Sequence, residues 1–246
     1  MKLYGLIGYP LGHSFSKKYF TKKFSKEAVN DCKYDNFSIP EIDELKQILS
    51  DHPQLCGFNI TIPYKQAVIT FLDDTSQLPK GLTACNCVKI EFGKLIGYNT
   101  DVVGFEQSLW PLLNSNHKKA LILGNGGAAE AVKFVLNKLQ IGFKVVSRKL
   151  HDDTNITYEE IDENILTDHL LIVNTTPLGT FPNTEECPDI PYQFITSNHY
   201  LFDLVYNPAK TLFLQRGEAH GALIKNGSDM LQIQAEESWK IWNENS

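Results

Sequence analysis

Residues 120–129 read Ala-Leu-Ile-Leu-Gly-Asn-Gly-Gly-Ala-Ala, and this stretch decides the fold of the second half of the chain. Its first four residues form a continuous apolar run, which is typical of a parallel strand buried on both faces. The run ends in Gly124-Asn-Gly126-Gly127-Ala128-Ala129, which satisfies G-x-G-x-x-G/A where a helix is expected to begin. The glycines permit a tight turn and let backbone N–H groups approach a pyrophosphate. The stretch therefore predicts a dinucleotide site, with a plain glycine turn as the alternative.

The end of the next expected strand, 143–147, bears on the choice of dinucleotide. A site selective for NAD carries Asp or Glu there to bind the ribose 2′-hydroxyl, and this chain has no acid at that point. Ser147, Arg148 and Lys149 instead offer a hydroxyl and two cations, and arginine forms bidentate bonds with phosphate. The sequence predicts NADP as the cofactor, although a solvated basic strand end gives the same pattern.

Strand and helix patterns alternate on both sides of this stretch. Further strands are expected at 170–174 and 200–204, which indicates a doubly wound parallel sheet. The same alternation begins at the N-terminus and closes with a hairpin around Gly93 and a helix over 101–113. We predict an α/β chain with two domains separated by a cleft. These are a substrate-binding α/β domain over 1–100, joined by a C-terminal helix over 229–246, and a Rossmann-type, doubly wound NADP-binding domain over 101–228.

The composition of the chain argues against nucleic-acid binding and membrane binding. The 246 residues include 23 Lys and Arg against 29 Asp and Glu, for a formal net charge of −6. An acidic chain lacks the basic face that nucleic-acid or polybasic membrane binding requires. No apolar stretch approaches the roughly 20 residues that span a bilayer. We therefore expect a cytoplasmic protein with no nucleic-acid and no membrane partner.

Cysteine and histidine spacing argues against a metal site. The five cysteines have no CxxC pairing and the seven histidines form no HxxxH pattern, so no metal is predicted. The oligomeric state stays open between a monomer and a homodimer.

Polar side chains interrupt apolar or glycine-rich sequence at four points in the N-terminal part. These are the segments Gly12–Ser16, Asn59–Lys65, Ala84–Asn86 and Gly97–Asp101. Each borders an expected strand end, and small-molecule sites in open α/β sheets gather at such ends. The segments predict one polar substrate site that faces the nucleotide domain. Structural roles remain as alternatives: helix caps for the serines and Asp101, and an ordinary surface lysine at position 65.

Taken in order, these motifs resemble the shikimate dehydrogenase family. The resemblance continues through Asn174-Thr-Thr-Pro-Leu-Gly179, Asp203-Leu-Val-Tyr-Asn-Pro208 and Gly227-x-x-Met230-Leu-x-x-x-Gln234-Ala. It implies reversible NADPH-dependent reduction of 3-dehydroshikimate to shikimate, a small-molecule substrate of the chorismate and aromatic amino-acid pathway. Two alternatives stay open: a quinate/shikimate dehydrogenase with relaxed cofactor use, and a nucleotide-sensing regulator without catalysis.

The resemblance also implies roles for individual residues. It assigns catalysis to Lys65 and Asp101. It assigns substrate binding to Ser14, Ser16, Asn59, Thr61, Lys65, Asn86, Asp101, Tyr206 and Gln234. It assigns NADP binding to Gly124, Gly126, Gly127, Ala128, Ser147, Arg148, Lys149, Thr175, Val205, Gly227 and Met230.

The implied catalytic pair agrees with the chemistry. Hydride that reaches a ketone carbon leaves negative charge on the oxygen, so the site needs a proton donor or a positive charge there. Lys65 supplies either, and Asp101 can orient the lysine or bind the reacting hydroxyl. Which of the two transfers the proton is left open.

Overall fold

A computed structural model describes residues 1–12, 15–150 and 155–244. The chain forms two compact units. Unit 1 comprises Met1–Thr100 and Gln234–Ser246, and unit 2 comprises Asp101–Ile233. No helix of the described residues is long and apolar enough to cross a membrane.

Unit 1 is built on a five-stranded mixed sheet. Its order is β2 (Cys32–Ser38), β1 (Lys2–Gly8), β3 (Leu55–Ile60), β4 (Cys87–Glu91) and β5 (Lys94–Tyr98). β1 pairs in parallel with β2 and β3, whereas β3, β4 and β5 run antiparallel. Phe92 and Gly93 both adopt positive φ between β4 and β5. This backbone matches the right-handed twist of the two strands, so a tight hairpin forms at the sheet edge.

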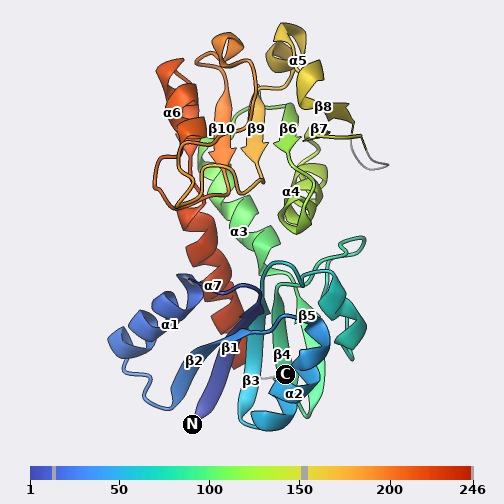
Figure 1. The fold of residues 1–246 in the computed structure, drawn as a ribbon, viewed down its shortest axis with the longest axis vertical. Coiled ribbons are helices and arrows are strands. Elements are labelled where there is room, and N and C mark those ends of the chain that lie inside the picture. The colour runs from blue at the N-terminus through green and yellow to red at the C-terminus, as the bar shows by residue number, and fades with distance from the viewer. Residues whose placement is uncertain (13–14, 151–154, 245–246) are drawn as a thin grey trace. The chain divides into compact units, whose positions relative to one another are not determined.

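Alternating side chains of β1 face the two layers that cover this sheet. Leu3 and Ile7 belong to a core shared with α2 (Leu45–Asp51) and the short helix η2 (Ala67–Phe71). Tyr4 and Leu6 belong to a second core, which is shared with α1 (Phe15–Lys26) and α7 (Ser228–Asn243). Figure 1 shows α2 in front of the sheet and α7 behind it. Another short helix, η1 (Ile42–Glu44), leads into α2.

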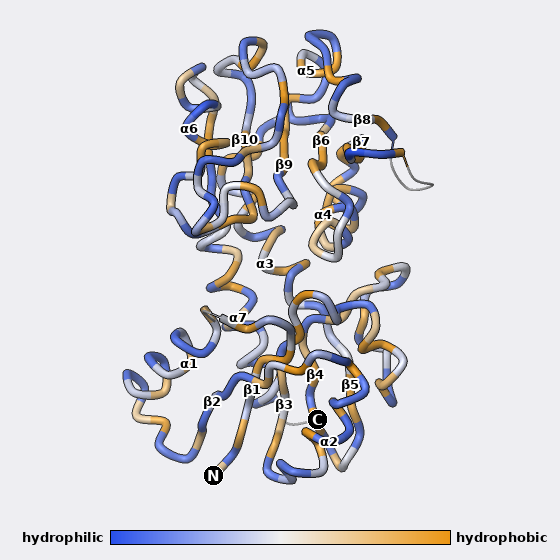
Figure 2. The backbone as a smooth tube through the Cα atoms, in the orientation of Figure 1, coloured by the Kyte–Doolittle hydropathy of each residue, from blue (hydrophilic) through white to orange (hydrophobic). Residues whose placement is uncertain are grey.

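Unit 2 is built on a six-stranded sheet in which every pair is parallel. Its order is β11 (Leu223–Lys225), β10 (Tyr200–Asp203), β9 (Leu171–Asn174), β6 (Lys119–Leu123), β7 (Gly142–Ser147) and β8 (Ile156–Thr157). The chain starts in the middle at β6, runs outward to β8, and then returns to build the other half from β9. Hydrophobic residues concentrate along β6 and β9 (Figure 2), as expected of strands covered on both faces. The order is that of a doubly wound dinucleotide-binding sheet.

Helices cover both faces of this second sheet, and the predicted fold class is confirmed. Phe213 and Leu214 of α6 (Leu212–Ala219) and Leu166 of α5 (Glu163–Asp168) share a core with Leu201 of β10. On the opposite face, Phe105 of α3 (Thr100–Leu109) packs edge-to-face on Phe202 of β10. The remaining helical segments are η3 (Trp110–Leu112), α4 (Gly127–Lys138), η4 (Tyr158–Glu160) and η5 (Tyr192–Phe194).

The helix expected over 101–113 is shorter than predicted. The α-helical part of α3 ends at Leu109, and η3 completes the segment as a 3₁₀ turn. Pro111 lies in that turn, and proline has no N–H to donate to the preceding helical turn.

Candidate functional site

The strand register of unit 2 brings four predicted nucleotide contacts to one sheet edge. Leu123 of β6 pairs with Val146 of β7 and with Asn174 of β9, and Asn174 pairs with Asp203 of β10. These strands are parallel and in register, so their carboxyl ends coincide. Ser147 ends β7, Gly124 and Thr175 directly follow β6 and β9, and Val205 lies two residues after the end of β10. This edge is where doubly wound sheets bind ligands.

The glycine-rich loop after β6 has the backbone that its sequence predicts. Gly124 has φ +101°, a conformation that favours glycine, and an added Cβ would lie 2.8 Å from the Thr176 methyl group. Gly126 precedes α4, and an added Cβ there would meet no atom within 4 Å. Open space above Gly126, next to the start of a 12-residue helix, suits a phosphate that binds backbone N–H groups.

The predicted 2′-phosphate residues lie at the end of β7. Ser147 is partly buried, and its hydroxyl donates to the Lys149 carbonyl. Arg148 and Lys149 are exposed. Burial raises the pKa of Tyr158 to about 12, and the nearby charge of Arg148 lowers it in part. Arg148 therefore lies near η4, with its charge available to an anion.

The edge of unit 2 also carries an aspartate that was not assigned a role from the sequence. Asp203 is fully buried and accepts hydrogen bonds from Asn174 Nδ2, the Val205 N–H and the Thr211 hydroxyl. Burial raises its pKa to about 6, and these three hydrogen bonds lower it in part. Nearby, Tyr206 is half-buried, and burial raises its pKa as well. Gly227 N–H donates to the Val205 carbonyl at 3.1 Å, which joins the start of α7 to this edge.

In unit 1, the predicted residues Asn59 and Asn86 belong to one buried hydrogen-bond network. Asn59 Nδ2 donates to the Asn86 carbonyl at 3.2 Å and to Ser238 Oγ at 2.9 Å. Asn59 Oδ1 accepts from the Tyr34 hydroxyl at 2.9 Å. Each of these bonds is buried, so each group has exchanged water for a fixed protein partner.

Tyr34 links Asn59 to the start of α1. Its phenol also accepts a hydrogen bond from Ser16, another predicted substrate residue. Burial raises the pKa of Tyr34, and this bond from Ser16 acts in the opposite direction. The protonated phenol therefore orients the Asn59 amide and the Ser16 hydroxyl together.

The same network extends through Thr100 to Gln234. The Thr100 N–H donates to Asn86 Oδ1 at 2.6 Å, and Asn86 Nδ2 donates to Thr100 Oγ1 at 3.1 Å. Thr100 Oγ1 lies 3.3 Å from both Gln234 Oε1 and Ser238 Oγ. Unit 1 thus brings together four predicted substrate residues: Ser16, Asn59, Asn86 and Gln234.

The other predicted substrate residues occupy separate positions. Thr61 N–H donates to the Ile7 carbonyl at 2.9 Å, and the Lys65 carbonyl accepts from Cys85 N–H at 2.8 Å, which fixes the segment after β3. Lys65 is half-buried in unit 1, whereas Asp101 is buried in the first turn of α3 and belongs to unit 2, as does Tyr206. Ser14 lies outside the described residues.

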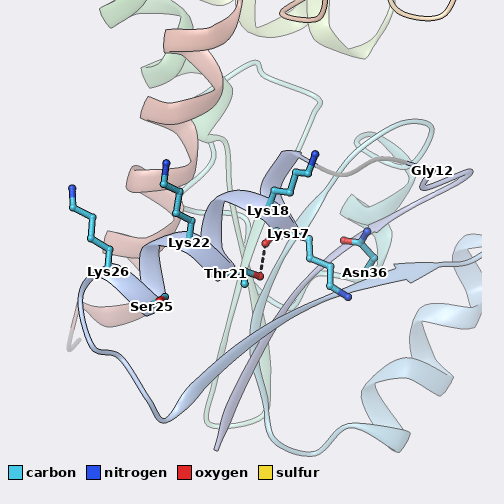
Figure 3. A pocket seen from close by; sticks show the side chains of 8 residues that line it. All are labelled: Gly12, Lys17, Lys18, Thr21, Lys22, Ser25, Lys26 and Asn36. Carbon is cyan, nitrogen blue, oxygen red and sulfur yellow. Dashed lines mark hydrogen bonds between the residues drawn. The ribbon is translucent and has the colours of Figure 1, made fainter.

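A measurable surface hollow lies elsewhere on unit 1. It has a volume of about 720 Å³ and is lined by residues of α1, Asn36 of β2 and Gly12 (Figure 3). Lys18, Lys22 and Lys26 project from one side of α1 (Figure 3), and no described acidic residue forms an ion pair with them. Lys17 pairs with Asp35 at 3.0 Å. Within the described part of the chain, no cluster of His, Cys, Asp and Glu has the geometry to hold a metal ion.

Comparison with known proteins identifies the family. Residues 6–88 match the sequence profile of the shikimate dehydrogenase substrate binding domain. A shikimate dehydrogenase (NADP(+)) of Methanococcus maripaludis strain S2 is 38% identical over 260 residues, which cover 98% of this chain and 91% of that protein. The chain belongs to the shikimate dehydrogenase family. The family resemblance of the motifs is therefore confirmed.

Further relatives agree over nearly the whole chain. A shikimate dehydrogenase (NADP(+)) of Caldicellulosiruptor saccharolyticus is 35% identical, covering 98% of this chain and 91% of that protein. A shikimate dehydrogenase solved in complex with NADP⁺ has a TM-score of 0.85 at 30% identity, covering 98% of this chain and 90% of the other. One from Thermus thermophilus, solved with NADP(H) and shikimate, has a TM-score of 0.85 at 25% identity, covering 99% and 94%.

The sequence motifs gave no role to several residues of the hydrogen-bond networks in the two units. Tyr34 and Ser238 lie in no quoted motif, and Thr100, Asn174 and Asp203 lie in motifs without an assigned role. One signal was present for Ser238, because it follows Gln234 by four positions and shares its helix face. Tyr34 gave no signal, since an aromatic residue in an expected strand is ordinary.

Proposed function

We propose that this chain catalyses the reversible NADP-dependent interconversion of shikimate and 3-dehydroshikimate. One observation carries the proposal: Ser16, Asn59, Asn86 and Gln234 share a single buried hydrogen-bond network in unit 1. A ligand with a carboxylate and several hydroxyls needs fixed donors and acceptors, and buried amides held by their neighbours supply them without reorganisation. Full-length similarity to shikimate dehydrogenases supports the same substrate.

The proposed dinucleotide site is the strand-end edge of unit 2. NADP⁺, when bound, supplies a nicotinamide that accepts hydride from the alcohol carbon. The N-terminus of α4 would bind the pyrophosphate, with Gly126 leaving room for it. Ser147, Arg148 and Lys149 would bind the 2′-phosphate, because two cations and a hydroxyl suit a dianion.

Lys65 and Asp101 are the proposed proton-transfer pair. Oxidation of the alcohol removes a hydride from carbon and a proton from oxygen, so one group must accept that proton. In the reverse direction the same group returns the proton while a positive charge stabilises the developing oxyanion. A lysine and an aspartate both transfer protons, so either member of the pair can carry out this step.

The first test is reduction of NADP⁺ followed at 340 nm with shikimate, beside quinate and NAD⁺. We expect turnover with shikimate and NADP⁺ alone. Comparable turnover with quinate or NAD⁺ would favour a broader dehydrogenase. NADP⁺ binding without turnover would favour a regulator.

A lysine substitution tests the catalytic assignment. Lys65→Ala is expected to lower kcat by about 10²- to 10⁴-fold while KM for shikimate changes little, because the proton is transferred only in the transition state. Lys80→Ala removes an exposed lysine of the same unit and serves as the control. An equal kcat in the two variants would contradict the role of Lys65.

We further propose that the chain functions in the cytoplasm as a monomer or homodimer. All five cysteines are free thiols, which fits a reducing compartment. Sedimentation equilibrium distinguishes the two oligomeric states.

A further inference from the structure

Asp203 is a buried carboxylate without a cationic partner among the described residues. It ends β10 and has no exposed surface. Its Oδ1 accepts from Asn174 Nδ2 at 2.9 Å and from the Val205 N–H at 3.0 Å, and its Oδ2 accepts from the Thr211 hydroxyl at 2.5 Å. A charge in this environment is costly unless hydrogen bonds satisfy it. Three donors converge on it, so the site is specific for an acceptor.

Two of these donors belong to segments that carry predicted nucleotide contacts. Asn174 directly precedes Thr175, and Val205 is itself a predicted contact. Asn174 Oδ1 in turn accepts from the N–H of Thr176 at 3.0 Å and from its hydroxyl at 2.6 Å. The carboxylate therefore fixes the turn after β9 through the Asn174 side chain.

The network reaches the glycine-rich loop as well. Thr175 donates its hydroxyl to the Leu123 carbonyl at 2.8 Å, and the same oxygen lies 3.3 Å from the Gly124 carbonyl oxygen. Side-chain hydrogen bonds of Asp203, Asn174 and Thr175 thus join the ends of β6, β9 and β10, with the peptide bond between Asn174 and Thr175 completing the path. A shift of the carboxylate would displace the segments around Thr175 and Val205 together.

We propose that Asp203 is a positioning residue for the dinucleotide, because its carboxylate holds Thr175 and Val205 in the geometry that binds NADP(H). The inference rests on the proposed function for the identity of the dinucleotide. An aspartate is required because it is an acceptor on both oxygens. In Asp203→Asn, the amide NH₂ would face either the Thr211 hydroxyl or the pair of donors from Asn174 and Val205.

The experiment measures NADP⁺ binding to the full chain by isothermal titration calorimetry without substrate, so that binding is separated from turnover. Asp203→Asn is expected to raise the Kd for NADP⁺ about tenfold, because one buried donor loses its acceptor. Thr211→Val, which removes one of the three donors, is expected to raise it about threefold, whereas Thr211→Ser keeps the hydroxyl and the affinity.

Two controls separate positioning from general loosening of the fold. Thr196→Val removes a hydroxyl before the amino end of β10, which is the end opposite the nucleotide edge, and is expected to leave the Kd unchanged. KM for shikimate at saturating NADP⁺ is expected to rise less than the Kd for NADP⁺ in Asp203→Asn and Thr211→Val, because Tyr206 is the one predicted substrate residue that directly follows Val205, and to stay at its wild-type value in Thr211→Ser and Thr196→Val. A purely structural role would lower thermal stability without this selective rise in Kd.

Three results would overturn the inference. One is an unchanged Kd in Asp203→Asn, and another is an equal rise in the Kd for NADP⁺ and the KM for shikimate. If Asp203→Asn does not fold, identical Kd values for Thr211→Val and Thr211→Ser would have the same meaning. A wild-type chain that binds no NADP⁺ would instead contradict the proposed function, and the inference with it.

Discussion

Replacing Tyr34 by phenylalanine removes a single oxygen from the centre of the unit 1 network. That oxygen donates to Asn59 Oδ1 at 2.9 Å and accepts from Ser16. The ring itself stacks on Phe20, with 4.6 Å between centroids, and this packing is retained in the variant. Any change in stability or binding therefore reports on the hydroxyl.

The expected magnitude follows from the groups that lose their partner. A buried polar group without a hydrogen bond costs about 1 to 3 kcal/mol, and removal of the phenol oxygen itself offsets part of the loss. For Tyr34→Phe we expect the free energy of unfolding to fall by about 2 kcal/mol. The Asn59 amide and the Ser16 hydroxyl would lose a shared orientation, so KM for shikimate is expected to rise about tenfold, with little change in kcat.

Tyr64→Phe is a matched control in the same unit. The Tyr64 hydroxyl is buried and donates to the Ile39 carbonyl at 2.7 Å, outside the substrate network. Urea unfolding, followed by tryptophan fluorescence, is expected to show similar destabilisation in both variants. Only Tyr34→Phe is expected to change KM. Equal KM values in the two variants would refute a role for Tyr34 in orienting substrate residues.

Three further predictions concern unit 2. Arg148→Ala is expected to weaken NADPH about tenfold or more and NADH hardly at all, because only NADPH carries the 2′-phosphate; equal losses in a fluorescence titration would reject this contact. Burial lowers the pKa of His117, His169 and His199. The folded unit therefore binds fewer protons at these residues than the unfolded chain does. The free energy of unfolding is therefore expected to fall as pH drops below about 6.5, by at most about 1.4 kcal/mol per pH unit for each histidine. Asp203 has the opposite effect: its pKa is raised to about 6, so its protonation below pH 6 favours the folded state. Thermal melts between pH 7.5 and 5.5 check the slope, and a flat profile in an Asp203→Ala background would contradict it. Gly227→Ala is expected to lower the melting temperature and NADP⁺ affinity, because a Cβ there would collide with the Leu204 carbonyl; wild-type values for both would show that the backbone moves aside.

Long, strongly patterned elements of the fold were predictable from sequence alone. The apolar run of β6 and the glycines that follow it predicted their structure, because a strand buried on both faces requires apolar residues and the tight turn after it requires glycine. β8 and β11 were not predicted, since they contain two and three residues, too few to show a period. The helix after Asp101 was placed correctly at its start and too far at its end, where Pro111 favours a 3₁₀ turn.

Some residues of the candidate site were also predictable from the sequence, and others were not. Asn59, Asn86 and Gln234 stood out because polar residues interrupted apolar sequence. Tyr34 gave no signal and Ser238 gave only its spacing from Gln234, because their partners lie 25 and 179 positions from them in the chain. Asp203 lay in a quoted motif, but its three donors become visible only when the strand ends are brought into register.

The lysines of α1 affect the rate at which an anionic substrate reaches the protein. Five of the chain's 23 basic residues lie in the twelve residues of this helix, on a protein of net charge −6. Lys17 and Lys23 form ion pairs with acidic residues. The other three, Lys18, Lys22 and Lys26, attract anions over about one Debye length, which is about 30 Å at 0.01 M salt and about 8 Å at physiological salt. Ser16 lies on the same helix, so the second-order rate of capture of an anionic substrate is expected to fall as salt is added, while the rate of the bound complex stays constant. The basic face of α1 thus attracts an anionic substrate to a protein whose own net charge is negative.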